Sequence, residues 1–244
     1  MEPPTISRLL DPYLHDRPVL VAVAAPREVE AVLAGLDRAG VDIPEPWSVR
    51  DCGRGIRVVH TGVGKANAAG AVARALAAER FAAVLCVGLA GALPCRDPLA
   101  VGQTLLADAC VLADEGLGTS GGFQSLSELG FPSTKTHGER FACDPDLRGA
   151  LDILADRIGL CATVSTCSGT DKMAASIAAR TGALVEDMES AAVGLVASRF
   201  GVPFGCLRVV SNRTGDRGQQ DWDLDGALSV VTRIAAALSP GRAA

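Results

Sequence analysis

The hydrophobic pattern along the chain alternates between short apolar runs and longer amphipathic stretches. The continuous apolar run at 19–25 is typical of a strand buried on both faces, and a second buried strand is expected at 82–87. A further apolar run spans 101–112, and another strand is expected at 160–165. Strands that alternate with helical patterns predict an α/β fold with a central, mostly parallel mixed sheet flanked by helices. Because no internal repeat or linker divides the chain, residues 18–240 are expected to form a single domain behind a loose leader at 1–17.

Turn and capping residues set the expected helix ends. Pro26 suits the first turn of a helix and Gly40 is a natural C-cap residue, so the first helix is expected to run between them. Asp144 and Asp171 are expected N-caps of two later helices. Three of the remaining helices are expected at 68–79, 145–158 and 221–238.

Polar side chains gather in the stretch 184–217, which reads as strand, turn, helix and strand. Three carboxylates come where the first strand passes into the helix: Glu186, Asp187 and Glu189. A second cluster, Ser211-Asn212-Arg213, stands where the next strand ends. In a parallel sheet both places lie on the carboxyl edge, where ligands bind. The pattern therefore predicts a carboxylate and an amide in one crevice.

Composition and charge exclude several classes of partner. The net charge of −5 argues against nucleic acid, whose phosphates demand clustered Lys and Arg. The eight cysteines form no C-x-x-C pair and are expected to be buried, reduced thiols, and the three histidines are too dispersed for a metal cage. The N-terminus is broken by prolines, and no apolar run is suited to cross a membrane, so a cytoplasmic protein is expected.

Two glycine-rich turns follow apolar strands, at 62–67 and 88–91. The first could offer backbone N–H groups to an anion or a sugar, although Asn67 replaces its third glycine and tight-turn geometry accounts for the glycines nearly as well. The second ends at Gly91, and the small residues at three of its four positions let a ligand approach the backbone. Taken alone, Glu28 is an acidic residue favourable to the dipole of the first helix.

Six segments, taken in order, resemble the nucleoside phosphorylase and nucleosidase superfamily, which cleaves N-glycosidic bonds of purine nucleosides. They are VAVAAPREVEAVL, HTGVGKANAAGA, LCVGLAGAL, VSTCSGTD, LVEDMESAAVGLVA and LRVVSN. The most specific piece is V-E-D-M-E-S-A-A followed by R-V-V-S-N. The resemblance covers nearly the whole chain, and it implies a small-molecule nucleoside substrate, no cofactor and a homo-oligomer.

The resemblance assigns roles around the ribose. Cleavage builds positive charge on the sugar and negative charge on the base, so a carboxylate beside the sugar stabilises the transition state. Glu189 matches the glutamate that binds the ribose hydroxyls, and Met188 matches the methionine that lies against the sugar. Glu28 matches the glutamate that activates water. Glu30 is close enough that a one-residue misalignment would transfer this role to it; Glu28 is preferred.

Asn212 bears on the identity of the base. Adenine-specific members of the superfamily place an aspartate there, which protonates N7 of the leaving base. An amide can donate to a 6-oxo group, whereas a carboxylate would face that oxygen as acceptor against acceptor. A 6-oxopurine such as hypoxanthine is therefore expected. Ser211 is expected to hold the base or orient Asn212, and Thr170 to contact the base; Arg208 forms either a structural ion pair or a substrate contact.

Water is the expected nucleophile. Phosphorylases of the superfamily bind phosphate with arginines and hydroxyls near the glycine loops, where this sequence offers Lys65 as its only cation. Three segments resemble the futalosine hydrolase branch in particular: A-x-x-x-E-V-E-A-V-L, DEG…GFQSLSELGFP and VVSNRTGDR followed by Trp222. This resemblance implies hydrolysis of futalosine to hypoxanthine in menaquinone biosynthesis. The alternatives are a phosphorylase or nucleosidase of another purine nucleoside (inosine-like, or methylthioadenosine/S-adenosylhomocysteine), or a non-catalytic nucleoside-binding protein.

The other end of futalosine is an aryl ketone with a carboxylate, which calls for apolar surface and a cation. The Gly/Ser-rich segment 114–140 is either a substrate-facing loop or a plain surface loop. It carries five side chains that could serve: Phe123, Phe131, Lys135, His137 and Arg140.

Overall fold

One nine-stranded sheet forms the centre of the molecule. The computed structural model describes Leu10, residues 17–134 and residues 138–238. The strand order is β10-β9-β5-β11-β4-β1-β3-β2, and β8 pairs with β5. The strands are β1 (Val19–Val23), β2 (Ser48–Gly53), β3 (Ile56–His60), β4 (Ala83–Ala92), β5 (Thr104–Leu112), β8 (Arg140–Ala142), β9 (Arg157–Thr163), β10 (Val185–Asp187) and β11 (Phe204–Arg213).

The sheet is mixed, as expected, and part of it closes on itself. β1 runs parallel to β3 and β4, β11 runs parallel to β4, and β9 runs parallel to β5 and β10. The pairs β2–β3, β5–β8, β5–β11 and β4–β10 are antiparallel. Because β10 pairs with both β9 and β4, the strands β10, β9, β5, β11 and β4 form a closed ring. This closure brings the short strand β10 against the end of β4.

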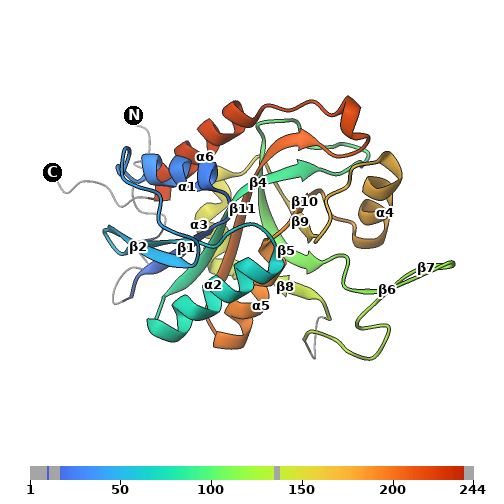
Figure 1. Cartoon of the computed structure of the whole chain (residues 1–244), viewed down its shortest axis with the longest axis horizontal. Helices are drawn as coiled ribbons and strands as arrows, with labels where there is room; N and C mark the ends of the chain where they lie inside the picture. Colours follow the sequence, from blue (N-terminus) through green and yellow to red (C-terminus); the bar gives the residue numbers. More distant parts are fainter. Residues whose placement is uncertain (1–9, 11–16, 135–137, 239–244) are drawn as a thin grey trace.

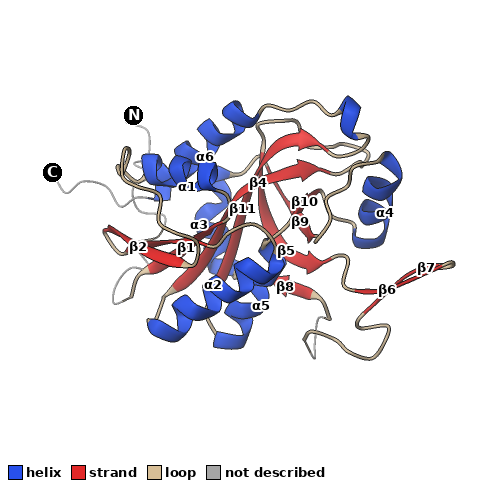
Figure 2. Cartoon of the chain, in the orientation of Figure 1, coloured by secondary structure: helices blue, strands red, loops and turns tan. Residues whose placement is uncertain are grey.

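Helices cover both faces of the sheet (Figure 2). α1 (Pro26–Gly35) packs with α6 (Leu224–Leu238), and α2 (Lys65–Ala78) packs with α5 (Ser190–Phe200) (Figure 1). The buried residues of β1 show that these pairs lie on opposite faces, since Leu20 belongs to the α2–α5 core and Val21 to the α1–α6 core. α3 (Pro145–Leu151) contacts β5 and β11, and α4 (Asp171–Thr181) contacts β9.

The first helix is shorter than expected. α1 ends at Gly35 rather than at Gly40. Leu36 still donates its N–H to Val32 O, but Asp37 takes a φ of 58°, outside the helical region, and turns the chain away. Gly35 itself is needed for packing, because a Cβ there would lie 2.3 Å from the backbone oxygen of Thr232 on α6.

The helix expected over 145–158 was wrong in its second half. α3 ends at Leu151, a 3-10 turn follows (Asp152–Leu154), and β9 begins at Arg157. Asp156 accepts a hydrogen bond from Thr104 N at 2.8 Å, and Arg157 pairs with Leu105 of β5. Pairing with a central strand therefore overrides the local helical pattern.

One of the two expected N-caps is confirmed and the other was wrong. Asp144 accepts hydrogen bonds from Asp146 N and Leu147 N, each at 3.0 Å. The N-cap of α4 is Thr170, whose Oγ1 accepts from Met173 N at 3.2 Å. Asp171 serves a different purpose: its carboxylate accepts from Asp216 N at 3.1 Å and so anchors the loop after β11.

Two other segments depart from the expected outline. α6 begins at Leu224 rather than Asp221, because Trp222 forms a bridge with Asn212 and Asp223 N donates to Ser211 O. The segment 114–140 contains the hairpin β6 (Gly116–Thr119) and β7 (Gly122–Ser125), which projects from the body of the molecule (Figure 1).

The sequence also led to expectations about the leader, the cysteines and membrane-spanning segments. The leader expected at 1–17 lies outside the described residues except for Leu10, which is buried, and Arg17. All eight cysteines are free; six are buried, and Cys95 and Cys167 are exposed. Within the ranges that the structure describes, no helix combines the length and apolarity needed to span a membrane.

Candidate active site

Three neighbouring strands bring the predicted acidic and amide clusters together. Gly91 of β4 pairs with Glu186 of β10 on one side and with Asn212 of β11 on the other. The register shifts between Val210 and Asn212, a bulge that lets the two chain stretches meet at this point. The crevice expected between the two clusters therefore exists, and its middle position has no side chain.

A buried arginine holds the carboxylates of this edge. Arg208 is 1% exposed, and its Nη2 lies 2.7 Å from Asp187 Oδ2 and 3.5 Å from Glu189 Oε2. Its Nε donates to Ser190 Oγ at 2.9 Å. Burial alone would lower the pKa of Arg208, but Asp187 and the other anionic neighbours raise it well above its ordinary value. Arg208 thus forms the buried ion pair that was one of its two expected roles.

Glu189 connects this network to the first glycine turn. The side chain is buried, and its Oε1 accepts a hydrogen bond from Gly64 N at 2.9 Å. Gly64 has a φ of 97°, which only glycine adopts readily, so the turn can aim its N–H at the carboxylate. Burial raises the pKa of Glu189 to about 7, Arg208 opposes the rise, and Asp187 adds to it. The site holds this carboxyl close to its titration point near neutral pH.

Glu28 reaches the same network from the other end of the chain. It is buried, and its carboxylate accepts from Leu89 N at 2.7 Å and from Ala25 N at 2.8 Å. A Cβ at Gly88 would lie 2.7 Å from Glu28 Oε1 and 2.5 Å from Arg208 Nη1, so both side chains pack over that glycine. Glu30, the alternative base, is exposed. The structure therefore brings Glu28, and not Glu30, to the carboxylate cluster.

A cavity of about 310 Å³ opens where Gly91 separates Glu186 from Asn212. Leu89, whose N–H binds Glu28, is two residues from Gly91 on β4, so the cavity and the carboxylate cluster share one strand end. The cavity is lined by Gly91, Cys167, Ser168, Gly169, Glu186, Asn212, Thr214, Arg217, Gln220 and Trp222. Its size, its mainly apolar surface and its few polar side chains suit a single heterocyclic base.

Hydrogen bonds fix the amide of Asn212. Its Oδ1 accepts from Ser211 Oγ at 3.0 Å, which is the orienting contact expected of Ser211. Its Nδ2 donates to Arg213 O at 3.1 Å and to Gln220 Oε1 at 3.3 Å. Gln220 Oε1 also accepts from Trp222 Nε1 at 3.1 Å. A 6-oxo group that takes an N–H from Asn212 therefore replaces either Gln220 Oε1 or Arg213 O as the acceptor.

Of the remaining predicted site residues, Gly91 lines the cavity, whereas Met188 and Thr170 do not. Met188 is half-buried between Asp187 and Glu189 in the chain. Thr170 is exposed, uses its hydroxyl to cap α4, and is not part of the cavity lining. Gly91 forms the cavity floor, and a Cβ there would lie 2.7 Å from Thr214 Cγ2.

The chain matches known proteins along nearly its whole length. The model of the family described as "Phosphorylase superfamily" matches residues 20–239. A futalosine hydrolase of Acidothermus cellulolyticus is 39% identical over 229 residues, covering 91% of this chain and 89% of the relative. One from Streptomyces coelicolor is 34% identical over 229 residues, covering 91% of this chain and 95% of the relative. The chain belongs to the futalosine hydrolase family of the phosphorylase superfamily.

Solved structures of the phosphorylase superfamily share this fold. A 5′-methylthioadenosine/S-adenosylhomocysteine nucleosidase from Neisseria meningitidis, in complex with methylthio-immucillin-A, has a TM-score of 0.73 and 20% identity, covering 91% of this chain and 97% of that one. A futalosine hydrolase mutant of Helicobacter pylori has a TM-score of 0.69 and 20% identity, covering 90% and 95%. The superfamily resemblance inferred from the sequence motifs and the α/β fold inferred from the apolar pattern are both confirmed.

Lys65, the cation of the first glycine turn, is already paired with two carboxylates. Its Nζ lies 2.6 Å from Asp114 Oδ1 and 3.0 Å from Glu115 Oε1. Two carboxylates already neutralise it, so it is a poor partner for phosphate. Among the described residues, no group of three or more His, Cys, Asp and Glu side chains could hold a metal ion.

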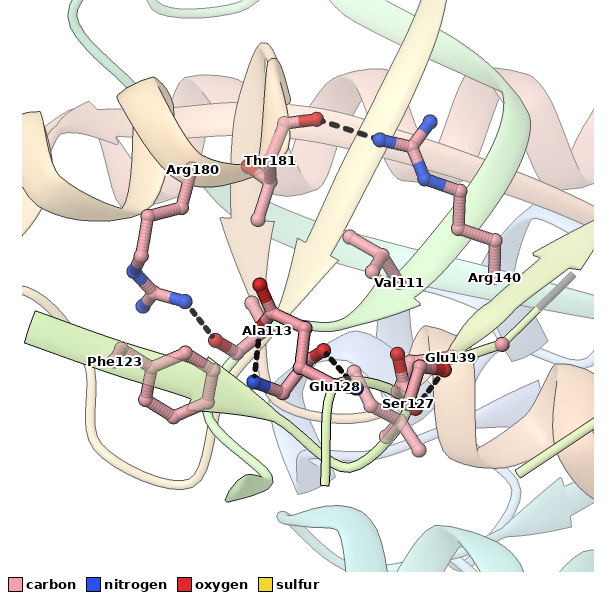
Figure 3. Close-up of a pocket in the computed structure, with 12 residues that line it drawn as sticks. Val111, Ala113, Phe123, Ser127, Glu128, Glu139, Arg140, Arg180 and Thr181 are labelled. Atoms are coloured by element: carbon pink, nitrogen blue, oxygen red, sulfur yellow. Dashed lines mark hydrogen bonds between the residues drawn. The ribbon is translucent and has the colours of Figure 1, made fainter. Parts of the chain in front are cut away.

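A larger cavity, of about 510 Å³, lies beside the β6–β7 hairpin (Figure 3). Arg180 stacks on Phe123 at 4.2 Å and donates to Ala113 O, and Arg140 donates to Thr181 O. This cavity contains none of the predicted catalytic carboxylates. Of the other residues considered for the carboxylate end of the substrate, Phe131 is 73% exposed, whereas Lys135 and His137 lie outside the described residues.

Sequence reasoning missed part of the cavity lining. Gln220 lies in a polar loop with no periodicity or motif that would mark it, and Arg217 entered only as the last residue of the segment VVSNRTGDR. Trp222 was noticed only as part of a family resemblance, and the structure places it on this cavity, with Arg217 stacked on it at 4.6 Å. Glu186 was noticed as acidic, but without a role, because its position opposite Gly91 depends on the pairing of β10 with β4.

Proposed function

We propose that this protein hydrolyses the N-glycosidic bond of futalosine and releases hypoxanthine and dehypoxanthine futalosine, a step of menaquinone biosynthesis. The observation that supports the proposal is that buried Glu28 binds Leu89 N of β4, two residues before Gly91, which lines a base-sized cavity together with Asn212. The family membership supports the same activity, since the relatives from Acidothermus cellulolyticus and Streptomyces coelicolor are futalosine hydrolases of similar length.

The carboxylate cluster supplies the chemistry at the sugar. As the bond between C1′ and the base nitrogen breaks, the ribosyl group gains positive charge, which Glu189 stabilises beside the hydroxyls. Met188, which follows Asp187, packs against the sugar. Arg208 keeps the carboxylates in place from below, through contacts at 2.7 and 3.5 Å to Asp187 and Glu189.

Glu28 acts as the general base. A water molecule attacks C1′ and transfers its proton to the Glu28 carboxylate, so that the new C–O bond replaces the broken C–N bond. The hydrogen bonds from Leu89 N and Ala25 N keep this carboxylate fixed, and a fixed base needs no reorganisation as the charge develops. The leaving purine takes up the electron pair of the broken bond. The proton that Glu28 gained returns through solvent to the purine, so that one water molecule is consumed and the carboxylate is regenerated.

Asn212 and its neighbours receive the leaving base. An amide N–H that exchanges Gln220 Oε1 for a purine oxygen stabilises the negative charge that develops on a 6-oxopurine. An aspartate at this position would repel that oxygen. This supports hypoxanthine over adenine as the product.

The test is a substrate panel with free base as the readout. Futalosine and inosine are incubated with the purified protein, with and without inorganic phosphate, and hypoxanthine is measured by chromatography. We expect release from futalosine without phosphate. Strict dependence on phosphate would refute the hydrolase and favour a phosphorylase, and binding without release would favour a nucleoside-binding protein.

We propose further that the protein works as a homo-oligomer in the cytoplasm. The support is the resemblance to a superfamily that commonly forms dimers or larger rings. Light scattering on the purified protein measures the assembly, and a monomeric mass at assay concentration would refute it.

A further inference from the structure

Glu186 is a buried carboxylate that the proposed mechanism leaves unused. It is 4% exposed and lines the base cavity, opposite Asn212 across Gly91. Paired residues on adjacent strands point to the same face of a sheet, so the two side chains flank the gap above the glycine. Adjacent strands lie about 4.8 Å apart. Because β4 lies between β10 and β11, the backbone positions of Glu186 and Asn212 are roughly 10 Å apart. A flat heterocycle fits edge-on between them.

Ser168 fixes the orientation of the Glu186 carboxylate but does not occupy all of its hydrogen-bond acceptor sites. Its Oε1 accepts from Ser168 N and its Oε2 accepts from Ser168 Oγ, both at 2.6 Å. Each carboxylate oxygen has a second lone pair, so acceptor sites remain toward the cavity. Among the ion pairs of the described residues, none includes Glu186, and burial raises the pKa of Glu186 while the Ser168 hydrogen bonds lower it. A buried carboxylate with no cationic partner calls for an explanation.

We propose that Glu186 is a specificity-determining residue that accepts the N1–H of a 6-oxopurine, on the edge of the base next to the one that Asn212 recognises. The inference rests on the proposed function, because it assumes that the cavity holds the purine. In the lactam form a 6-oxopurine carries a hydrogen on N1, which a carboxylate accepts. A 6-aminopurine presents a bare N1 lone pair, which the same carboxylate repels.

The geometry makes this discrimination independent of Asn212. Asn212 meets the oxygen or N7 side of the base, whereas Glu186 meets N1, and the two residues stand on different strands. Ser168, which holds Glu186 through both its N–H and its hydroxyl, is itself buried and lines the cavity. Ser168 is therefore a positioning residue that sets the direction in which Glu186 accepts.

The experiment measures binding of free bases by titration calorimetry, which needs no turnover. The probes are hypoxanthine, 1-methylhypoxanthine and adenine, and the protein is the full chain. For the wild type we expect 1-methylhypoxanthine and adenine to bind about 10- to 100-fold more weakly than hypoxanthine, the range for one charge-assisted hydrogen bond. Equal affinity for hypoxanthine and its 1-methyl derivative would overturn the proposal without any variant.

The substitution Glu186→Gln tests the direction of the hydrogen bond. A glutamine can accept from Ser168 N with its oxygen and offer its N–H to the cavity, so the ratio of hypoxanthine to adenine affinity should fall at least tenfold. The matched control is Glu139→Gln, another buried glutamate that accepts a serine hydroxyl (Ser127 Oγ, 2.8 Å) but does not line this cavity, and its ratio should not change.

The outcomes separate this inference from the proposed function. A folded Glu186→Gln protein with an unchanged base ratio overturns the role of Glu186, even if futalosine is hydrolysed. A shifted ratio in a protein that does not hydrolyse futalosine supports Glu186 as the N1 reader and refutes the proposed substrate. Circular dichroism and a thermal melt establish folding, and the 1-methylhypoxanthine comparison decides the matter if the variant does not fold.

Discussion

Replacing Glu189 by Gln should change how the stability of the protein depends on pH. Glu189 is 6% exposed, and burial, with a smaller contribution from Asp187, raises its pKa from 4.5 to about 7 against the opposing effect of Arg208. A carboxyl whose pKa rises on folding binds more protons in the folded state than in the unfolded state between these values. Its contribution to the free energy of unfolding is therefore largest in acid and falls as pH rises through the window from 4.5 to 7.

The expected size follows from the same two values. At about 1.4 kcal/mol per pKa unit, the contribution of Glu189 should fall by about 2–3 kcal/mol between pH 5 and pH 8. The assay is urea unfolding of the wild type and Glu189→Gln at several pH values. The wild-type free energy of unfolding minus that of the variant should decrease by this amount as pH rises. A difference that stays constant with pH would falsify the account of Glu189 as a carboxyl held near its titration point.

Three further substitutions test the site. Glu28→Gln should lower kcat for futalosine by about 10²- to 10⁴-fold, the range for loss of a general base, and leave hypoxanthine binding intact. Glu30→Gln is the matched control. A larger loss of kcat in this control would make Glu30, and not Glu28, the general base. Asn212→Asp should reduce kcat/KM on the 6-oxopurine by about 10- to 100-fold, because carboxylate and carbonyl oxygen repel, and undiminished activity would contradict that argument. Arg208→Met should cost about 3–5 kcal/mol in urea unfolding at neutral pH, since it leaves buried carboxylates without a cation, and a loss below 1 kcal/mol would show that the cluster relaxes.

The order of strands and helices was readable from the sequence because burial on both faces of a sheet leaves continuous apolar runs. The run at 82–87 predicted the first part of β4. It missed the extension to Ala92, because the glycines at 88 and 91 look like a turn when they are read locally. The prediction of a helix over 145–158 was wrong after Leu151, because β9, which begins at Arg157, pairs with β5 and this pairing overrides the local helix propensity. Asp171 was misplaced as an N-cap because Thr170 and Asp171 are both good capping residues, and only the contact with Asp216 separates their roles.

The sequence by itself determined the chemistry available in the stretch 184–217: carboxylates after one strand, an amide after the next, and motifs that resemble one superfamily. The tertiary structure decided which of these groups meet. Gly91 separates Glu186 from Asn212 because β10 closes the ring of strands against β4. Arg208 lies beside both Glu28 and Glu189 because β11 pairs Arg208 with Gly88, and the first turn of α1 brings Glu28 over the same glycine. These contacts depend on the register between strands distant in sequence, and no local pattern encodes that register.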